Sequence, residues 1–368
     1  MRKYLFICFV LMLFVSGCTK KEADIRRIVV DVKEIQKSVP VSRFVDSLKY
    51  IPLETTEASL FKQIDKLCMD KEGNFYILDR EGVKAIYKFD KQGRFQGQIG
   101  YWGKGPREYL EITDFCLYGD TIVEIYDSSR EKRMQYATSG NFIQEENNWD
   151  MGGAAFIHVG DTVAFYASCG GYAPNLNVYI NGKEYGFFKQ DYPEMRDKSE
   201  YFHTDGSRLY YSDNYNDTLY CFRDGKMVPY FYVDFGEYKL PKGIRDISKA
   251  REGDFCYNID ELKFTSRYTC FNFENAALCI EVFWDKEQNT VELVRSFDND
   301  IDGVPFLIRG RVSSCPDKII TYLGAGSILR NYNNCRKLGE EISVMYEDLV
   351  KQVTEDSNPV IVLAYMKK

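Results

Sequence analysis

Histidine is scarce in this chain, since His158 and His203 are the only two among 368 residues. A zinc site needs three or four ligands at recognisable spacing, and two isolated histidines do not supply it. The scarcity therefore argues against a zinc enzyme. Hydrogen bonding within the fold is the plainer role for both side chains.

Long apolar runs and an excess of positive charge are also lacking. Beyond the first 17 residues no apolar stretch is long enough to span a bilayer. The chain has 48 Lys and Arg against 55 Asp and Glu, which gives a formal net charge of −7. Because phosphate binding needs a basic surface, this balance excludes nucleic acid as the expected partner.

The familiar catalytic motifs are missing as well. The sequence contains no Gly-x-Ser-x-Gly elbow and no His-Glu-x-x-His helix, and its Gly-rich stretch at 100–109 lacks the Lys-Ser/Thr ending of a phosphate-binding loop. No cofactor is expected from these patterns, and enzymatic activity is left uncertain.

The N-terminus has the pattern of an export signal. Met1-Arg2-Lys3 precedes an apolar run that ends at Val15, too short for an ordinary transmembrane helix. The next residues, Ser16-Gly17-Cys18, complete a stretch that resembles the lipobox of bacterial lipoproteins, in which the cysteine is acylated and becomes the new N-terminus. The resemblance implies a signal peptide over 1–17, lipidation at Cys18 and a tether with an N-terminal segment over 18–45. An ordinary secretory signal with an incidental cysteine stays open as the alternative.

Eleven cysteines are present, and nine remain after Cys8 in the signal and Cys18 at the lipid site. An odd number cannot all pair. Because several lie among apolar strand residues, we expect mostly free buried thiols, with one disulfide possible but not assignable.

The residues from Ile64 to Tyr109 form the clearest unit of the chain. Four short apolar runs are separated by Asp- and Gly-containing segments, of which 70–74 and 90–94 are the strongest hairpin signals. The pattern predicts a four-stranded antiparallel meander. One such sheet has two faces to bury, so further copies are expected.

The pattern recurs at about 40 to 60 residues, beginning again near 112, 154, 201, 269 and 306. The last unit is one strand short, whereas Leu48–Leu53 provides a spare strand at the front. These features predict an all-β, six-bladed β-propeller over 46–368, whose last blade is closed by the N-terminal strand. Helical spacing predicts insertions over about 240–262 and 338–353, the second of them in the final blade. Two packed β-domains would leave the incomplete last unit unexplained.

The link between the first two units carries a family resemblance. Gly103-Lys104-Gly105-Pro106-Arg107-Glu108-Tyr109 resembles a Gly-x-Gly-Pro-x-Glu-Tyr signature of a six-bladed β-propeller family of Gram-negative lipoproteins, relatives of the NHL-repeat propellers. The segments 50–54 and 358–362 resemble the two ends of that family. The resemblance implies the propeller fold and an outer-membrane lipoprotein in the cell envelope, with the periplasmic or surface side undetermined. It implies no chemistry.

The same link provides candidate ligand-binding residues. Trp102, Lys104, Arg107 and Glu108 could be presented at a propeller face, where loops commonly bind ligands. The alternative is that the Gly and Pro residues only shape a connection between blades.

His158 and His203 are further candidates, because both fall in expected first strands, which line the central channel of a propeller. Asp79, Asp127 and Asp213 each follow a second strand of a unit. They could form a ring of carboxylates around a metal, but we expect them to accept backbone N–H bonds in turns.

The expected function is that of a lipid-anchored, extracytoplasmic binding or scaffolding module. Its expected partners are the membrane, through the lipid, and another envelope protein or a glycan, because some of the 28 Tyr and 25 Phe residues could stack on sugars. The alternative for the aromatics is to fill the space between blades. The competing function is a metal-dependent hydrolase or lyase, lactonase-like, with calcium held by carboxylates in the central channel.

Overall fold

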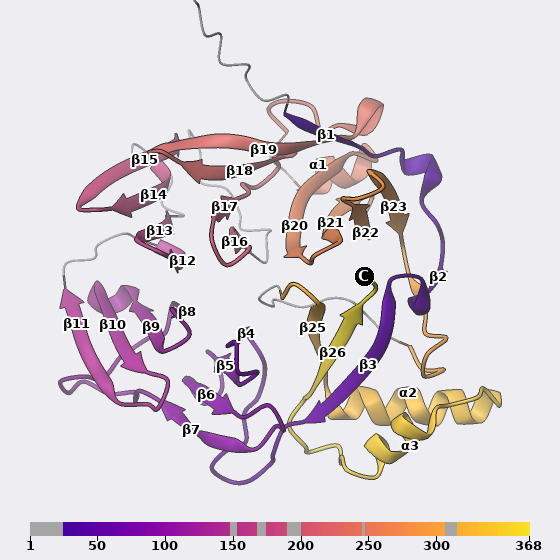
Figure 1. Ribbon diagram of the computed structural model, residues 1–368, viewed down its shortest axis with the longest axis horizontal. Coiled ribbons are helices and arrows are strands. Elements are labelled where there is room, and N and C mark those ends of the chain that lie inside the picture. The colour runs from indigo at the N-terminus through magenta and orange to yellow at the C-terminus, as the bar shows by residue number, and fades with distance from the viewer. Residues whose placement is uncertain (1–24, 148–152, 168–173, 190–199, 245–246, 306–314) are drawn as a thin grey trace, which may run out of the picture.

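The chain folds into a closed ring of six β-sheet blades, with one further two-stranded sheet, and Figure 1 shows the ring along its axis. This computed structural model describes residues 25–147, 153–167, 174–189, 200–244, 247–305 and 315–368. The ring is the predicted six-bladed β-propeller. The first strand of each blade faces the centre and the last strand lies at the rim (Figure 1).

Blades 1 to 3 are four-stranded antiparallel meanders in chain order. Alternating residues of each strand pack toward the neighbouring blades on either side, which is why the inner strands are apolar on both faces. Their strands are β4 (Lys66–Met69), β5 (Phe75–Asp79), β6 (Ala85–Phe89), β7 (Phe95–Ile99), β8 (Asp114–Tyr118), β9 (Ile122–Asp127), β10 (Lys132–Ala137), β11 (Phe142–Asn147), β12 (Gly153–Val159), β13 (Thr162–Ala167), β14 (Pro174–Ile180) and β15 (Lys183–Lys189).

Blades 4 and 5 continue the pattern. Their strands are β16 (Phe202–Thr204), β17 (Leu209–Tyr211), β18 (Thr218–Arg223), β19 (Lys226–Asp234), β20 (Cys256–Phe264), β21 (Tyr268–Asn275), β22 (Leu278–Asp285) and β23 (Thr290–Val294). Blade 4 gains a fifth strand at its rim, because β1 (Arg26–Val29) pairs in parallel with β19.

Blade 6 closes the ring with strands from both ends of the chain. Its described strands run in the order β25 (Lys318–Leu323), β26 (Val360–Met366) and β3 (Val45–Pro52). The pairing of β26 with β3 confirms the predicted closure by an N-terminal strand. Pro52 lies on the edge strand, where its missing N–H interrupts no ladder. The strand expected at 306–308 lies outside the described residues.

The final blade contains a helical insertion, as expected, but the bounds of both insertions differ from the expectation. Among the described residues between 240 and 262, only α1 (Ile247–Glu252) is helical, because the residues from Cys256 form β20. Near the C-terminus two helices form instead of one, α2 (Ala325–Leu338) and α3 (Val344–Val350), and Gly339 at φ 73° ends the first. Four short 3-10 turns complete the helical elements of the described ranges: η1 (Val32–Glu34), η2 (Val41–Arg43), η3 (Ser128–Arg130) and η4 (Gly236–Tyr238). Within the described ranges, no helix combines the length and apolarity needed to cross a bilayer.

Strand β20 was missed because its side-chain alternation is broken twice. Its register against β21 shifts between Tyr257 and Asp260 and again between Asp260 and Lys263. At these bulges Asn258 and Glu261 take positive φ angles of 57° and 49°. Each bulge moves the following residues to the other face of the strand, so the apolar spacing imitates a helix.

The segment 25–44, which we call the N-terminal strap, crosses the rims of blades 4 and 5 before entering blade 6. After β1, the Gln36 N–H donates to the Leu293 carbonyl of β23 at 2.9 Å. Next, β2 (Val39–Pro40) pairs in parallel with β24 (Phe297–Asp298). From Arg26 onward the N-terminal segment therefore contributes strands to the folded ring.

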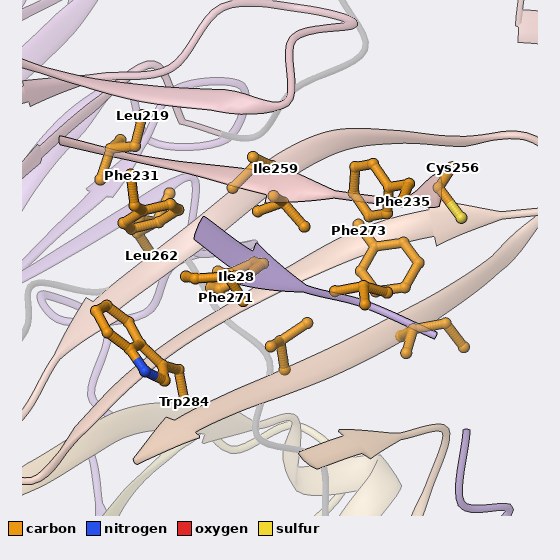
Figure 2. Packing of buried hydrophobic residues seen from close by; sticks show 14 of the residues in the cluster. Ile28, Leu219, Phe231, Phe235, Cys256, Ile259, Leu262, Phe271, Phe273 and Trp284 are labelled. Carbon is orange, nitrogen blue, oxygen red and sulfur yellow. The ribbon is translucent and has the colours of Figure 1, made fainter. Parts of the chain in front are cut away.

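Aromatic and aliphatic side chains fill the spaces between blades. Between blades 4 and 5, Phe231 and Phe271 lie 5.7 Å apart in a stacked arrangement, and Ile28 from β1 packs into the same cluster (Figure 2). Packing between blades is thus a major role of the aromatics, as expected. Buried free thiols such as those of Cys68, Cys116 and Cys270 lie among the described residues, and burial raises the pKa of the Cys68 thiol to about 12. Such thiols are inert core side chains at neutral pH.

Candidate functional site

The loop over 100–109 joins β7 of blade 1 to β8 of blade 2 and exposes two neighbouring aromatic rings. Tyr101 is 63% exposed and Trp102 is 58% exposed. Large aromatic side chains are normally buried because of their apolar area, so an exposed pair within one loop needs an explanation.

The backbone of this loop is locked by its own residues. The Glu108 carboxylate accepts the Gly105 N–H at 2.6 Å, and a Cβ at Gly103 would lie 2.1 Å from that carboxylate. The Gly103 N–H donates to the Tyr109 carbonyl at 2.9 Å, and the Tyr109 N–H donates to the Tyr101 carbonyl at 3.1 Å. Tyr109 itself is buried between the blades. The Gly-x-Gly-Pro-x-Glu-Tyr pattern therefore encodes a rigid loop anchored by a buried tyrosine.

Trp102 is held in place although its ring is exposed. Its indole N–H donates to the Leu110 carbonyl at 3.1 Å, and the Lys84 ammonium lies 5.8 Å from the ring centroid. Lys84 comes from the turn between β5 and β6 and has a positive φ of 54°. The ring is thus oriented before any ligand arrives, which reduces the entropy cost of binding.

The other candidates in the loop divide into two groups. Lys104 and Arg107 are exposed, and Arg107 has φ 65° with its guanidinium 5.2 Å from the Phe142 ring centroid. Glu108 is folded back into the loop, and its backbone carbonyl accepts a bond from Arg130 at 3.2 Å. The structure therefore places Trp102, Lys104 and Arg107 at the surface and gives Glu108 a structural contact.

Two apolar residues that sequence analysis did not single out extend this surface. Leu60 and Val83 are exposed, on segments that touch one another, since a Cβ at Gly82 would lie 2.7 Å from the Lys62 Cβ. We call Leu60, Val83, Tyr101 and Trp102 the blade-1 patch. The missed residues lie in loops of ordinary composition. Val83 directly precedes Lys84, whose ammonium lies 5.8 Å from the Trp102 ring centroid.

His158 contributes to the contact between blades 2 and 3. Its Nδ1 lies 2.8 Å from Oε2 of the buried Glu124, and its ring stacks on Tyr118 with centroids 3.7 Å apart. Gln135 donates to the other oxygen of Glu124. The side chain is therefore engaged within the fold.

His203 has partners of its own on blade 4. Its Nε2 lies 3.3 Å from the Ser212 hydroxyl, and its Nδ1 lies 3.6 Å from a Glu200 carboxylate oxygen. The two histidines thus serve different polar networks.

Ion pairs and backbone bonds tie the inner strands together around the channel. Lys66 on β4 donates to Asp114 on β8 at 2.8 Å, and the same carboxylate accepts the Phe156 N–H of β12 at 2.9 Å. One carboxylate therefore connects blades 1, 2 and 3. Burial lowers the pKa of Lys66, but the Asp114 carboxylate and the neighbouring Cys68 and Cys116 together outweigh burial, so the net shift of the pKa is upward.

Glu200, beside the inner strands, has a strongly raised pKa. Burial first, and then the Asp260 carboxylate, raise its pKa to about 8, while Lys66 and Lys263 act in the opposite direction. Its backbone N–H donates to Asp260 of blade 5 at 3.2 Å. Lys66 belongs to blade 1 and Lys263 to blade 5, so the Glu200 carboxyl lies within electrostatic reach of both blades.

The repeated aspartates behave as turn caps. Asp79 accepts the Gly82 and Lys62 N–H groups, both at 2.7 Å. Asp127 accepts the Leu110 N–H at 2.7 Å, which joins its turn to the loop entering the same blade. These contacts confirm the turn role for Asp79 and Asp127.

No group of three or more His, Cys, Asp or Glu side chains in the described part of the chain has an arrangement suited to a metal ion. The expected lipidation site, Cys18, lies outside the described residues.

Comparison with known proteins supports the fold. The chain is similar to the crystal structure of a presumed exported protein from Bacteroides fragilis NCTC 9343, with a TM-score of 0.78 and 16% identity over 94% of this chain and 100% of the other. Weaker similarity links it to a member of the DUF4221 family from Bacteroides vulgatus, with a TM-score of 0.49 and 11% identity over 88% and 97% of the two chains. A virginiamycin B lyase from Staphylococcus aureus has a TM-score of 0.42 and 10% identity over 86% and 99%.

None of the curated proteins compared with this chain matches it. The sequence profile of a domain of unknown function, DUF4934, matches residues 27–365, which is nearly the whole described ring. This six-bladed propeller therefore belongs to the DUF4934 family.

Proposed function

We propose that this protein is a lipid-anchored, extracytoplasmic binding module that holds its ligand at the blade-1 patch. The observation that carries the proposal is the state of Trp102, whose indole N–H is fixed to Leu110 while more than half of its surface is exposed. Rigid, exposed aromatic side chains on a scaffolded loop are the usual anchors of recognition surfaces.

The setting of Trp102 suits either a glycan or a protein of the envelope. Its flat face and the neighbouring Tyr101 can stack on a sugar ring, and Lys104 and Arg107 add hydrogen-bond donors beside it. Leu60 and Val83 add apolar area of the kind found at the centre of protein interfaces.

The proposed extracytoplasmic location is supported by the lipobox-like residues ending at Cys18 and by the presumed export of the similar Bacteroides fragilis protein. Two or three acyl chains on that cysteine would hold the protein stably at the outer membrane, whereas a single chain would not.

The competing function, a metal-dependent hydrolase or lyase, would use the channel. Glu200 is the acid suited to proton transfer there, because its pKa of about 8 leaves it protonated at neutral pH. The channel carboxylates are, however, engaged in contacts between blades, as Asp114 and Asp260 illustrate.

A crosslinking experiment in intact cells tests the proposed function. Trp102→p-benzoylphenylalanine places a photoreactive group at the patch, and the same replacement at Ile143, an exposed residue of β11, is the matched control. We expect adducts with a defined protein or glycan from position 102 only. If positions 102 and 143 give the same set of crosslinked adducts, and the purified protein turns over a lactone or a glycan, the hydrolase or lyase function would be favoured instead.

A further inference from the structure

Strand β1 and the residue before it carry an apolar pair that no other part of the described ring covers. Ile25 is 48% exposed and Val29 is 56% exposed, whereas Ile28 between them is buried against blades 4 and 5 (Figure 2). Alternation along the strand places Ile28 in the core and leaves Val29 on the opposite face.

Chain length decides what lies near this surface. Ile25 follows Cys18 by seven residues, and a fully extended chain of that length spans at most about 25 Å. If Cys18 carries the lipid, as the proposed function states, the rim of blade 4 cannot leave the immediate neighbourhood of the bilayer. The inference rests on that part of the proposed function.

The charge of this rim permits contact with anionic lipids. The chain as a whole has a net charge of −7, but the four cations of segment 25–37 are balanced by two acids within it and by two ion-pair partners. The groups are Arg26, Arg27, Lys33 and Lys37 on one side and Asp31, Glu34, Asp234 and Glu237 on the other. This surface therefore lacks the repulsion that the rest of the acidic protein would experience at an anionic headgroup layer.

We infer that the rim of blade 4 faces the membrane, with the outer face of β1 against the lipid surface and with Ile25 and Val29 in contact with the lipids. Blades 1 and 4 lie opposite one another in a ring of six (Figure 1). The orientation therefore holds the blade-1 patch on the side of the ring farthest from the bilayer, where a partner outside the membrane can reach it.

The orientation can be measured by fluorescence quenching with the full-length lipidated protein. Val29→Trp and its matched control Ile143→Trp each introduce an exposed indole on a rim strand, of blade 4 and of blade 2 respectively. The protein is reconstituted in vesicles of phosphatidylethanolamine and phosphatidylglycerol with brominated acyl chains. The three native tryptophans contribute equally to both variants, so a difference reports the new ring.

We expect a larger fractional loss of fluorescence for Val29→Trp than for Ile143→Trp. Protein that floats with the vesicles is membrane-bound. If such protein shows equal fractional losses of fluorescence for the two variants, or a larger loss for Ile143→Trp, the proposed orientation is overturned while the lipid anchor is still supported. Mass spectrometry showing no acyl chain on Cys18 would reject the anchor and, with it, the orientation, since the short tether is its premise.

Discussion

Tyr50 on β3 lies directly opposite Val362 on β26, so a strand near the N-terminus and the last strand of the chain are neighbours in one sheet. The same register pairs Ile51 with Ile361, and both isoleucines are buried between blades 6 and 1. Closure thus depends on side chains from both ends of the sequence, which form a core only when the ring is complete.

The closure predicts coupled losses of stability. Ile51→Ala and Ile361→Ala should each lower the free energy of unfolding by about 2–5 kcal/mol, because each leaves a cavity. The double variant should show a coupling energy of roughly 0.5–3 kcal/mol, measured by urea denaturation. Ile143→Ala, at an exposed position, is the control and should change stability by less than about 0.5 kcal/mol. Additive losses would contradict the pairing.

Asn358 should be intolerant of substitution. Its buried side-chain amide donates to the carbonyls of Glu54 at 2.8 Å and Ser59 at 2.9 Å, and its oxygen accepts the Phe61 N–H at 3.2 Å. Asn358→Ala leaves these groups unpaired, and each unpaired buried group costs roughly 1–3 kcal/mol. Thermal denaturation should show a markedly lower midpoint than for Asn147→Ala, an exposed control. Equal denaturation midpoints for Asn358→Ala and Asn147→Ala would mean that water takes over the hydrogen bonds of the Asn358 amide.

The closed ring of blades could be predicted from the sequence, but the contacts inside the ring could not. Hairpin signals and the spare strand at 48–53 predicted the blades and their closure, because turn chemistry and period-2 alternation are local. Strand β20 was missed because two bulges break its alternation. Helix α2 was missed because Gly326 and three asparagines lower its propensity, and its packing against blade 6 stabilises it instead.

The candidate site was predictable only in part. The pattern at 103–109 identified the loop that exposes Trp102, because glycine and proline occur where the backbone must turn or adopt a restricted conformation. Lys84 and the contact of Asp114 with blade 3 were not predictable. They depend on distances across the ring, which local sequence does not encode.

The ion pair that joins the first blades should be strongly coupled. Lys66→Met leaves the Asp114 carboxylate buried without its cation, and losing one partner of such a pair costs about 3–5 kcal/mol. Adding Asp114→Asn to Lys66→Met should recover part of that loss, because the uncompensated charge is removed. Urea denaturation of the two single variants and the double variant measures the effect, and a double variant less stable than Lys66→Met would contradict it.

Glu200 should make stability fall with rising pH. Burial and the neighbouring acids raise its pKa from 4.5 to about 8, so the folded protein binds the proton more tightly than the unfolded chain. Its stabilising contribution is therefore complete below about pH 4.5 and is lost as pH rises through 8. Glu200→Gln should flatten the stability profile between these limits, whereas Glu111→Gln, an exposed control, should reproduce the original slope. Equal slopes for Glu200→Gln and the unmodified protein would contradict the assignment.

Preorganisation of the patch gives a prediction about Gly103. A Cβ at this position would collide with the Glu108 carboxylate, so Gly103→Ala should loosen the loop while Trp102 stays present. Binding of the crosslinked partner should weaken, with little change in global stability, since the loop is at the surface. Calorimetry of binding and of unfolding separates the two effects. A variant that binds normally would show that the loop conformation is irrelevant to recognition.

The central claim is that the exposed ring of Trp102 is the anchor of a binding surface. The most direct test is the affinity of the partner or glycan recovered by crosslinking, measured for Trp102→Ala and for Ile143→Ala. An aromatic anchor contributes about 2 kcal/mol or more, so the first variant should bind more than tenfold more weakly and the second should bind as the unmodified protein does. Equal affinity for Trp102→Ala and the unmodified protein would contradict the account.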